Sequence, residues 1–133
     1  MSEVTSQRQY SILVVDDEQS ILDMFEALLG RSGYKVHRVS RGEDALVFLH
    51  ETRPTAALGQ APVDLVILDI LMPGMDGCEV CRRIKSHPLW NHIPVLMVTV
   101  SSSPRDQSDA MAAGADDYVT KPFSSAELLF RVR

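Results

Sequence analysis

Hydrophobic and polar residues follow two different patterns along the chain. Short apolar runs rich in β-branched residues predict strands at residues 11–15, 34–39, 65–68, 94–99 and 117–120. Between these runs, apolar residues recur every three or four positions, which is typical of amphipathic helices. This spacing predicts helices at residues 21–29, 42–49, 78–85 and 104–113, and a last helix from residue 124 to the chain end.

Five strands that alternate with five helices predict an α/β fold, a doubly wound parallel sheet with helices on both faces. We expect one domain over residues 10–133, after a flexible polar segment at residues 1–9. Residues 51–62, ETRPTAALGQAP, contain proline and glycine and predict a long surface loop. In sheets of this kind ligands bind beyond the carboxyl ends of the strands, so that edge is the expected place for a site.

Polar side chains stand at that edge. The residues that end or follow the first, third, fourth and fifth strands are Asp16, Asp17, Asp69, Thr99 and Lys121. Because parallel strands end at the same edge of a sheet, we expect these five side chains to converge. Asp69 closes the apolar run VDLVILD, and an ionised carboxylate is rarely buried without a partner or a metal.

Each of these residues also has a plain structural explanation. Asp16 and Asp17 could cap the first helix, and a threonine at a strand end is unremarkable by itself. Asp76 is the expected N-cap of the third helix, so Asp69 is not needed for that role. The joint spacing of all the residues at this edge favours a functional site.

Three converging carboxylates repel one another unless a cation joins them. Hard oxygen ligands suit Mg²⁺, or the similar Mn²⁺, which commonly binds phosphate oxygens as well. A carboxylate left accessible can attack phosphorus and form an acyl phosphate. The ammonium of Lys121 and the hydroxyl of Thr99 would then stabilise the charge that develops on the phosphoryl group.

Composition argues against several other classes of function. The chain of 133 residues has 13 basic and 18 acidic residues and a formal net charge of −5, so direct nucleic-acid binding is not expected. No apolar run reaches the roughly 18 residues of a membrane span, and no signal peptide is evident, so we expect a cytoplasmic protein. Cys78 and Cys81 fall on the apolar side of a helix and predict buried free thiols rather than a redox or zinc pair.

Four ordered motifs together resemble the receiver domain of two-component response regulators, the CheY-like family. They are VVDDE at residues 14–18, LDILMPGMDG at 68–77, VLMVT at 95–99 and GADDYVTKPF at 114–123. The resemblance implies a flavodoxin-like (βα)5 fold with strand order 2-1-3-4-5. It also implies a phosphoacceptor switch that receives its phosphoryl group from a histidine kinase or a histidine phosphotransfer protein.

The resemblance assigns roles by position. Asp69 matches the phosphoacceptor, Asp17 the direct metal ligand, and Asp16 its supporting acid. The backbone carbonyl of Leu71 would be a further metal ligand. Lys121 would pair with Asp69 and then with the phosphoryl group.

Thr99 and Tyr118 match the pair of residues that couples phosphorylation to a surface change in this family. The Lys121–Pro122 bond is typically cis in the family. The chain departs from the family pattern at Leu71, where polar residues are common, and at Val100, where a small residue is usual.

Several alternatives remain open at this stage. A haloacid-dehalogenase-type phosphatase also uses an aspartyl phosphate, but it needs a second aspartate where this chain has Leu71. The last helix runs into the chain end at Arg133, so we expect either a stand-alone receiver or one followed by an output domain. A homodimer that forms on phosphorylation is a further expectation from the resemblance.

Overall fold

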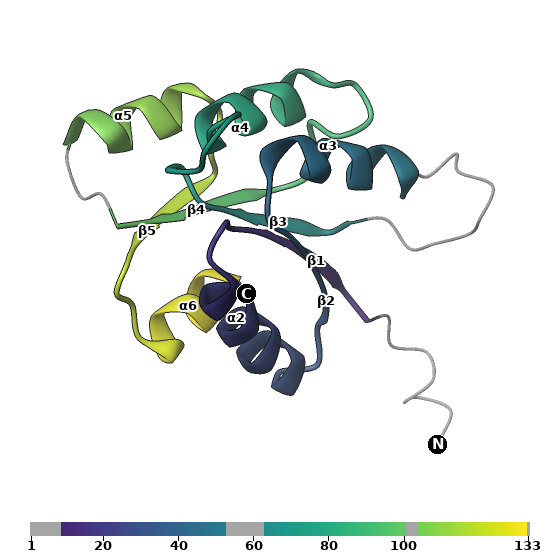
Figure 1. Ribbon diagram of the computed structural model, residues 1–133, viewed down its shortest axis with the longest axis vertical. Helices are drawn as coiled ribbons and strands as arrows, with labels where there is room; N and C mark the ends of the chain where they lie inside the picture. Colours follow the sequence, from purple (N-terminus) through teal and green to yellow (C-terminus); the bar gives the residue numbers. More distant parts are fainter. Residues whose placement is uncertain (1–8, 53–62, 101–103, 133) are drawn as a thin grey trace.

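The computed structural model describes residues 9–52, 63–100 and 104–132 (Figure 1). The described residues form the strands β1 Ser11–Val15, β2 Lys35–Val39, β3 Leu65–Leu68, β4 Val95–Thr99 and β5 Asp117–Thr120. They form the helices α2 Gln19–Arg31, α3 Gly42–Glu51, α4 Gly77–Ser86, α5 Pro104–Ala112 and α6 Ser125–Val132. None of these helices, within the described ranges, is long and apolar enough to cross a membrane.

All the strand pairs are parallel, and the strand order is β2-β1-β3-β4-β5. This order confirms the predicted fold class. The order reverses between β1 and β3, where Val15 lies beside Leu68. A crevice at such a reversal is the usual ligand site of an open α/β sheet, and here the next residues along the two strands are Asp16 and Asp69.

Helices cover both faces of the sheet (Figure 1): α3, α4 and α5 lie on one face, α2 and α6 on the other. Alternate residues of β1 point to opposite faces. Leu13 and Val15 join the core under α3, α4 and α5, whereas Ile12 and Val14 join the core under α2 and α6. Because both faces are buried, the inner strands β1, β3 and β4 are nearly continuous apolar runs rather than alternating ones.

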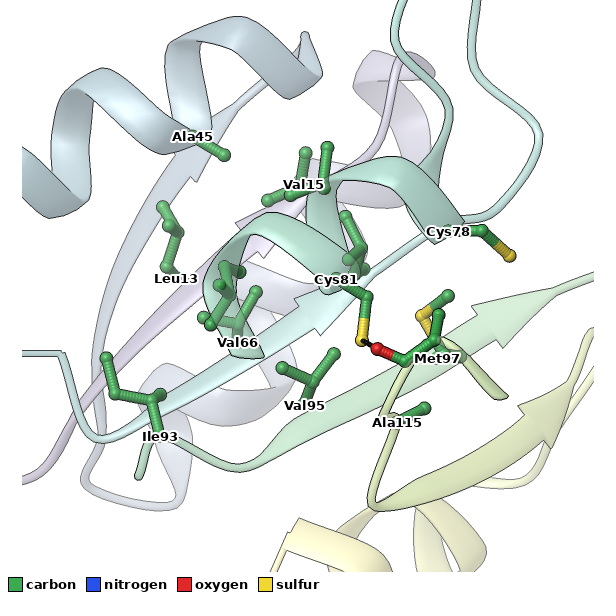
Figure 2. Packing of buried hydrophobic residues seen from close by; sticks show 14 of the residues in the cluster. Leu13, Val15, Ala45, Val66, Cys78, Cys81, Ile93, Val95, Met97 and Ala115 are labelled. Atoms are coloured by element: carbon green, nitrogen blue, oxygen red, sulfur yellow. Dashed lines mark hydrogen bonds between the residues drawn. The ribbon is translucent and has the colours of Figure 1, made fainter. Parts of the chain in front are cut away.

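The predicted buried thiols are confirmed. Cys78 and Cys81 are both buried and not joined in a disulfide. Figure 2 shows Cys81 among core side chains that include Val66, Val95 and Met97. The thiol of Cys81 donates a hydrogen bond to the Ala113 carbonyl at 3.5 Å.

Some element boundaries differ from the prediction. Tyr34 lies outside β2 because its N–H bonds to a carbonyl in the last turns of α2. Pro94 precedes β4, since proline has no N–H for a ladder. Glu51 is the last residue of α3 rather than the start of a loop. The rest of the predicted loop, from residue 53, and residues 1–8 lie outside the described ranges.

Candidate functional site

Three carboxylates meet at the carboxyl ends of β1 and β3. Asp16, Asp17 and Asp69 each offer an oxygen within 4.8 Å of the others. Asp16 is 2% exposed and Asp69 is 6% exposed, whereas Asp17 is open to solvent. The sheet register brings them together, since the Asp69 N–H donates to the Val15 carbonyl at 3.0 Å.

The Lys121 ammonium lies against this group from the end of β5. Its Nζ is 2.8 Å from Asp16 Oδ2, 3.5 Å from Asp69 Oδ2 and 3.9 Å from Glu18 Oε1. Burial alone would lower the pKa of Lys121, but its hydrogen bond to Asp16 and the neighbouring carboxylate charges raise that pKa overall. The expected pairing with Asp69 is therefore the longer contact, and Asp16 is the nearer partner.

The surroundings of Asp69 disfavour its ionised form more than water would. Burial and the nearby Asp16 charge raise its pKa, and three neighbours, the Lys121 charge, the Leu71 N–H and Thr99, offset this only in part. The Leu71 N–H donates to Asp69 Oδ1 at 3.3 Å. Three carboxylates against one ammonium leave the site short of positive charge.

Thr99 ends β4 with its hydroxyl fully buried. That hydroxyl is close enough to Asp69 to lower the acid's pKa slightly, yet among the described residues none gives it a hydrogen bond of ordinary geometry. Buried hydroxyls normally have a partner. The Thr99 Oγ1 is thus a donor available at the edge of the acidic group.

Tyr118 lies on β5, the strand next to Thr99. It pairs in register with Met97 of β4 and is half-buried against the core under α3, α4 and α5. The bond between Lys121 and Pro122 is cis, as the resemblance implied. Leu71 and Val100 are both exposed, at 54% and 62%.

The helix-cap explanations are decided by the hydrogen bonds. The N-cap of α2 is Glu18, not Asp16 or Asp17, and it makes no side-chain cap bond. Asp16 Oδ1 instead accepts from the Glu18 N–H at 3.0 Å. Asp76 does cap α4, accepting from the Glu79 N–H at 2.9 Å. Neither Asp16 nor Asp69 is therefore used as a helix cap.

Gly77 and Glu18 lie close to the acidic group, although no pattern in the sequence predicts a role for either. A Cβ at Gly77 would lie 2.1 Å from the Asp69 carbonyl oxygen, so only glycine allows α4 to begin this close to the acid. The Gly77 N–H donates to the Ile70 carbonyl at 2.9 Å. Both residues stand in sequence motifs, Glu18 in VVDDE and Gly77 in MDG. Only the packing of the folded chain shows that Glu18 lies near Lys121 and that Gly77 lies against the Asp69 carbonyl.

The donor set suits a hard divalent cation. The carboxylates are close together, all their ligand atoms are oxygen, and one ammonium does not balance them. Mg²⁺ and Mn²⁺ prefer such oxygen donors. Asp16, Asp17 and Asp69 therefore fit a metal of this class.

The model of the response regulator receiver domain family matches residues 12–133. The chain belongs to that family. Receiver domains are phosphorylation-based switches in two-component signalling and generally bind Mg²⁺ at an acidic site of this kind. This membership gives no support to the phosphatase alternative.

Relatives agree with this assignment. The receiver is 42% identical over 123 residues to the uncharacterized transcriptional regulatory protein YrkP of Bacillus subtilis and to the transcriptional regulatory protein GltR of Pseudomonas aeruginosa. Those alignments cover 92% of this chain but only 48% and 47% of the two relatives, so the receiver spans about half their length.

A solved structure gives the same fold. The chemotaxis protein CheY4 of Vibrio cholerae is 30% identical and superimposes with a TM-score of 0.83, covering 94% of this chain and 97% of CheY4. The likeness extends over nearly the whole of both chains, in agreement with the strand order β2-β1-β3-β4-β5.

Proposed function

We propose that Asp69 accepts the phosphoryl group from a histidine of a partner, either a histidine kinase or a histidine phosphotransfer protein. The observation that carries this proposal is the position of Asp69 among Asp16, Asp17, Lys121 and Thr99. A carboxylate oxygen of Asp69 bonds to phosphorus as the phosphorus–nitrogen bond breaks, and the electron pair leaves with the donor imidazole. The receiver catalyses only this step and its own dephosphorylation.

The neighbours of Asp69 would together stabilise the negative charge on the phosphoryl oxygens. Asp16, Asp17 and Asp69, with the Leu71 carbonyl, would hold Mg²⁺ or Mn²⁺, and the bound ion supplies positive charge beside the phosphoryl oxygens. Lys121 places an ammonium on the other side.

An apolar hollow next to Lys121 offers a surface on which the partner protein could bind. It has a volume of about 370 Å³ and is lined by Met24 of α2, by Phe123 in the segment after β5 and by Val100 after β4. An apolar surface beside the acidic group suits a protein donor better than a small anion. A partner of this kind implies a cytoplasmic receiver.

Mass spectrometry tests the acceptor. Incubation with acetyl phosphate and MgCl2 is expected to add one phosphoryl group to the wild type and none to Asp69→Asn. Asp44→Asn, an exposed acid on α3, is the matched control and is expected to be phosphorylated normally. Chelating the metal is expected to abolish the reaction, since Lys121 alone does not balance three carboxylates. Equal phosphorylation of Asp69→Asn would overturn the assignment.

We also propose that Thr99 and Tyr118 couple phosphorylation to the surface formed by α5, β5 and α6. Among the described residues the buried Thr99 hydroxyl makes no hydrogen bond of ordinary geometry, so phosphoryl oxygens would draw it inward and leave space for the Tyr118 ring. A ligand shifts such an equilibrium only through its different affinity for the two states.

Beryllofluoride, a mimic of the acyl phosphate, tests this coupling. It is expected to move the amide signals of residues 104–120 in the wild type and to move them much less in Thr99→Ala. Binding itself is followed separately through the signal of Asp69. The coupling fails if Thr99→Ala binds beryllofluoride and shows the same changes across residues 104–120.

The receiver is proposed to act within a longer regulator as one domain of residues 10–133. The support is that the chain spans about half the length of relatives named transcriptional regulatory proteins. Nucleic-acid contact would then belong to an output domain, because the net charge here is −5. A phosphorylation-dependent homodimer would use the face of α6, where Phe130 is 76% exposed.

A further inference from the structure

Arg38 links the edge strand β2 to the helix that follows Asp16 and Asp17. It pairs in register with Val14 of β1, whose side chain lies in the core under α2 and α6. Because paired residues of neighbouring strands point to the same face of a sheet, the side chain of Arg38 points to that face as well. The helix α2 covers β2 there (Figure 1).

The guanidinium of Arg38 contacts three side chains of α2. Nη2 donates to Gln19 Oε1 at 2.8 Å. Nη1 lies 2.6 Å from Asp23 Oδ1 and 2.8 Å from Glu26 Oε1. Positions 19, 23 and 26 share one face of the helix, since residues three and four apart are neighbours. The Arg38 side chain is 29% exposed, so one partly buried arginine joins β2 to the first turns of α2.

The start of α2 lacks the usual stabilisers of a helix N-terminus. Its N-cap, Glu18, makes no side-chain cap bond to any residue that the structure describes, and the first turn contains no acidic residue. A side-chain cap and an acid in the first turn each commonly stabilise this end of a helix. The bond from Arg38 to Gln19, the first residue of α2, therefore holds a helix end that is otherwise weakly fixed.

The same helix end is tied to the proposed metal ligands. The Glu18 N–H donates to Asp16 Oδ1 at 3.0 Å, and the exposed Asp17 lies between these two residues in the chain. The Asp16 N–H donates at 3.3 Å to the carbonyl of Val39, the residue after Arg38. A displacement of the start of α2 from β2 would therefore move both acids.

We propose that Arg38 is a positioning residue for the metal site. By holding the first turn of α2 against β2, it fixes Asp16 and Asp17 in the arrangement that binds Mg²⁺ or Mn²⁺. Mg²⁺ demands near-ideal ligand geometry, and groups that orient metal ligands contribute to metal affinity. This inference rests on the part of the proposed function that assigns a metal to these acids, and it does not depend on which residue accepts the phosphoryl group.

A titration with MgCl2 followed by ¹H–¹⁵N NMR tests this role. Arg38→Met is expected to bind Mg²⁺ about threefold to tenfold more weakly than the wild type, which is less than the loss of a group bonded directly to a metal ligand. The direction distinguishes positioning from charge, because removal of a positive charge near the carboxylates would by itself strengthen the binding of a dication. Arg131→Met is the matched control, since Arg131 is ion-paired with Asp117 at 2.8 Å between α6 and β5. It should not weaken Mg²⁺ binding.

A second variant leaves the net charge unchanged. Gln19→Ala removes the contact of Arg38 with the first residue of α2, while alanine favours the helix itself. It should weaken Mg²⁺ binding by about twofold or more, in the same direction as Arg38→Met. Gln107→Ala makes the same change at an exposed position of α5 and should leave the affinity unchanged.

Amide hydrogen exchange of the metal-free protein provides a readout that does not involve the metal. The N–H groups of Ile21 and Leu22 both donate to the Glu18 carbonyl at 3.1 Å. They should exchange faster in Arg38→Met than in the wild type or in Arg131→Met, because the first turn of α2 opens more often.

Unchanged or stronger Mg²⁺ binding by Arg38→Met would overturn the role of Arg38, and so would equal weakening by Arg131→Met. Failure of the wild type to bind Mg²⁺ would contradict the metal site and this inference together. Normal phosphorylation of Asp69→Asn would contradict only the acceptor assignment.

Discussion

At the scale of single residues, the acidic site is set by small differences in distance. Lys121 Nζ is 0.7 Å nearer to Asp16 than to Asp69, at 2.8 Å against 3.5 Å. The ammonium is therefore the closer partner of Asp16, and Asp69, the acceptor proposed above, has the longer contact. Leu71, two residues after Asp69, is 54% exposed beside this carboxylate and cannot hydrogen-bond a water through its side chain.

Replacement of Leu71 should change the lifetime of the phosphorylated form. Hydrolysis needs a water in line with the bond between the Asp69 oxygen and phosphorus, and an apolar side chain neither orients nor admits one. We expect Leu71→Asn to lose its phosphoryl group several-fold faster, where about 1.4 kcal/mol corresponds to tenfold in rate. The measurement is acyl-phosphate decay after the donor is removed.

Leu89→Asn is the control for this experiment, since Leu89 is a partly exposed leucine in another loop. Its decay rate should equal that of the wild type. If the wild type decays as fast as Leu71→Asn, the side chain of Leu71 does not shield the phosphoryl group.

At the scale of secondary-structure elements, the start of α4 fixes the backbone that carries Asp69. Asp76 caps the helix, and the Gly77 N–H bonds to the Ile70 carbonyl at 2.9 Å. Gly77 has no Cβ to separate the helix from this backbone. The position of the Asp69 carboxylate thus depends on a residue eight places further along the chain.

A glycine-to-alanine pair tests this contact. Gly77→Ala places a Cβ 2.1 Å from the Asp69 carbonyl oxygen, and this overlap should cost about 1–3 kcal/mol of unfolding free energy. Gly30→Ala meets nothing within 4 Å on α2 and should instead gain about 0.5–1 kcal/mol. Urea denaturation measures both. Equal stability of Gly77→Ala and the wild type would show that the helix start moves freely.

At the scale of the whole molecule, the central sheet is buried between two helix layers. Cys81 is in the deeper of the two thiol positions, inside the core under α3, α4 and α5, whereas Cys78 lies at its edge. Burial raises the pKa of Cys81 to about 11. Its thiol can therefore be reached by a reagent only when the core opens.

Thiol labelling measures that opening. In the single-cysteine variant Cys78→Ala, the remaining Cys81 should react with a disulfide reagent only at the rate set by global unfolding. In Cys81→Ala, the remaining Cys78 should react faster, by about tenfold or more, because local opening of the first turn of α4 is enough. Comparable rates for the two variants would contradict a core that opens as one unit.

The sequence by itself determined the elements, the fold class and the approximate position of the site. Continuous apolar runs and periods of three to four residues are local properties of the chain. Because both faces of a parallel sheet must be buried, the runs at β1, β3 and β4 could be recognised directly. Asp16, Asp69 and Thr99 follow or end these strands, and parallel strands end at one edge. Their convergence therefore needed no coordinates.

Only the tertiary structure decided which groups touch. That Lys121 lies nearer to Asp16 than to Asp69 and that Gly77 packs on the Asp69 carbonyl both depend on how distant elements pack. The element boundary at Tyr34 was also settled by a hydrogen bond to another segment, since its N–H bonds to the Leu29 carbonyl of α2. Periodicity fixes which face of an element is buried, but not its position along its neighbour, and differences below 1 Å in that position select the contacts.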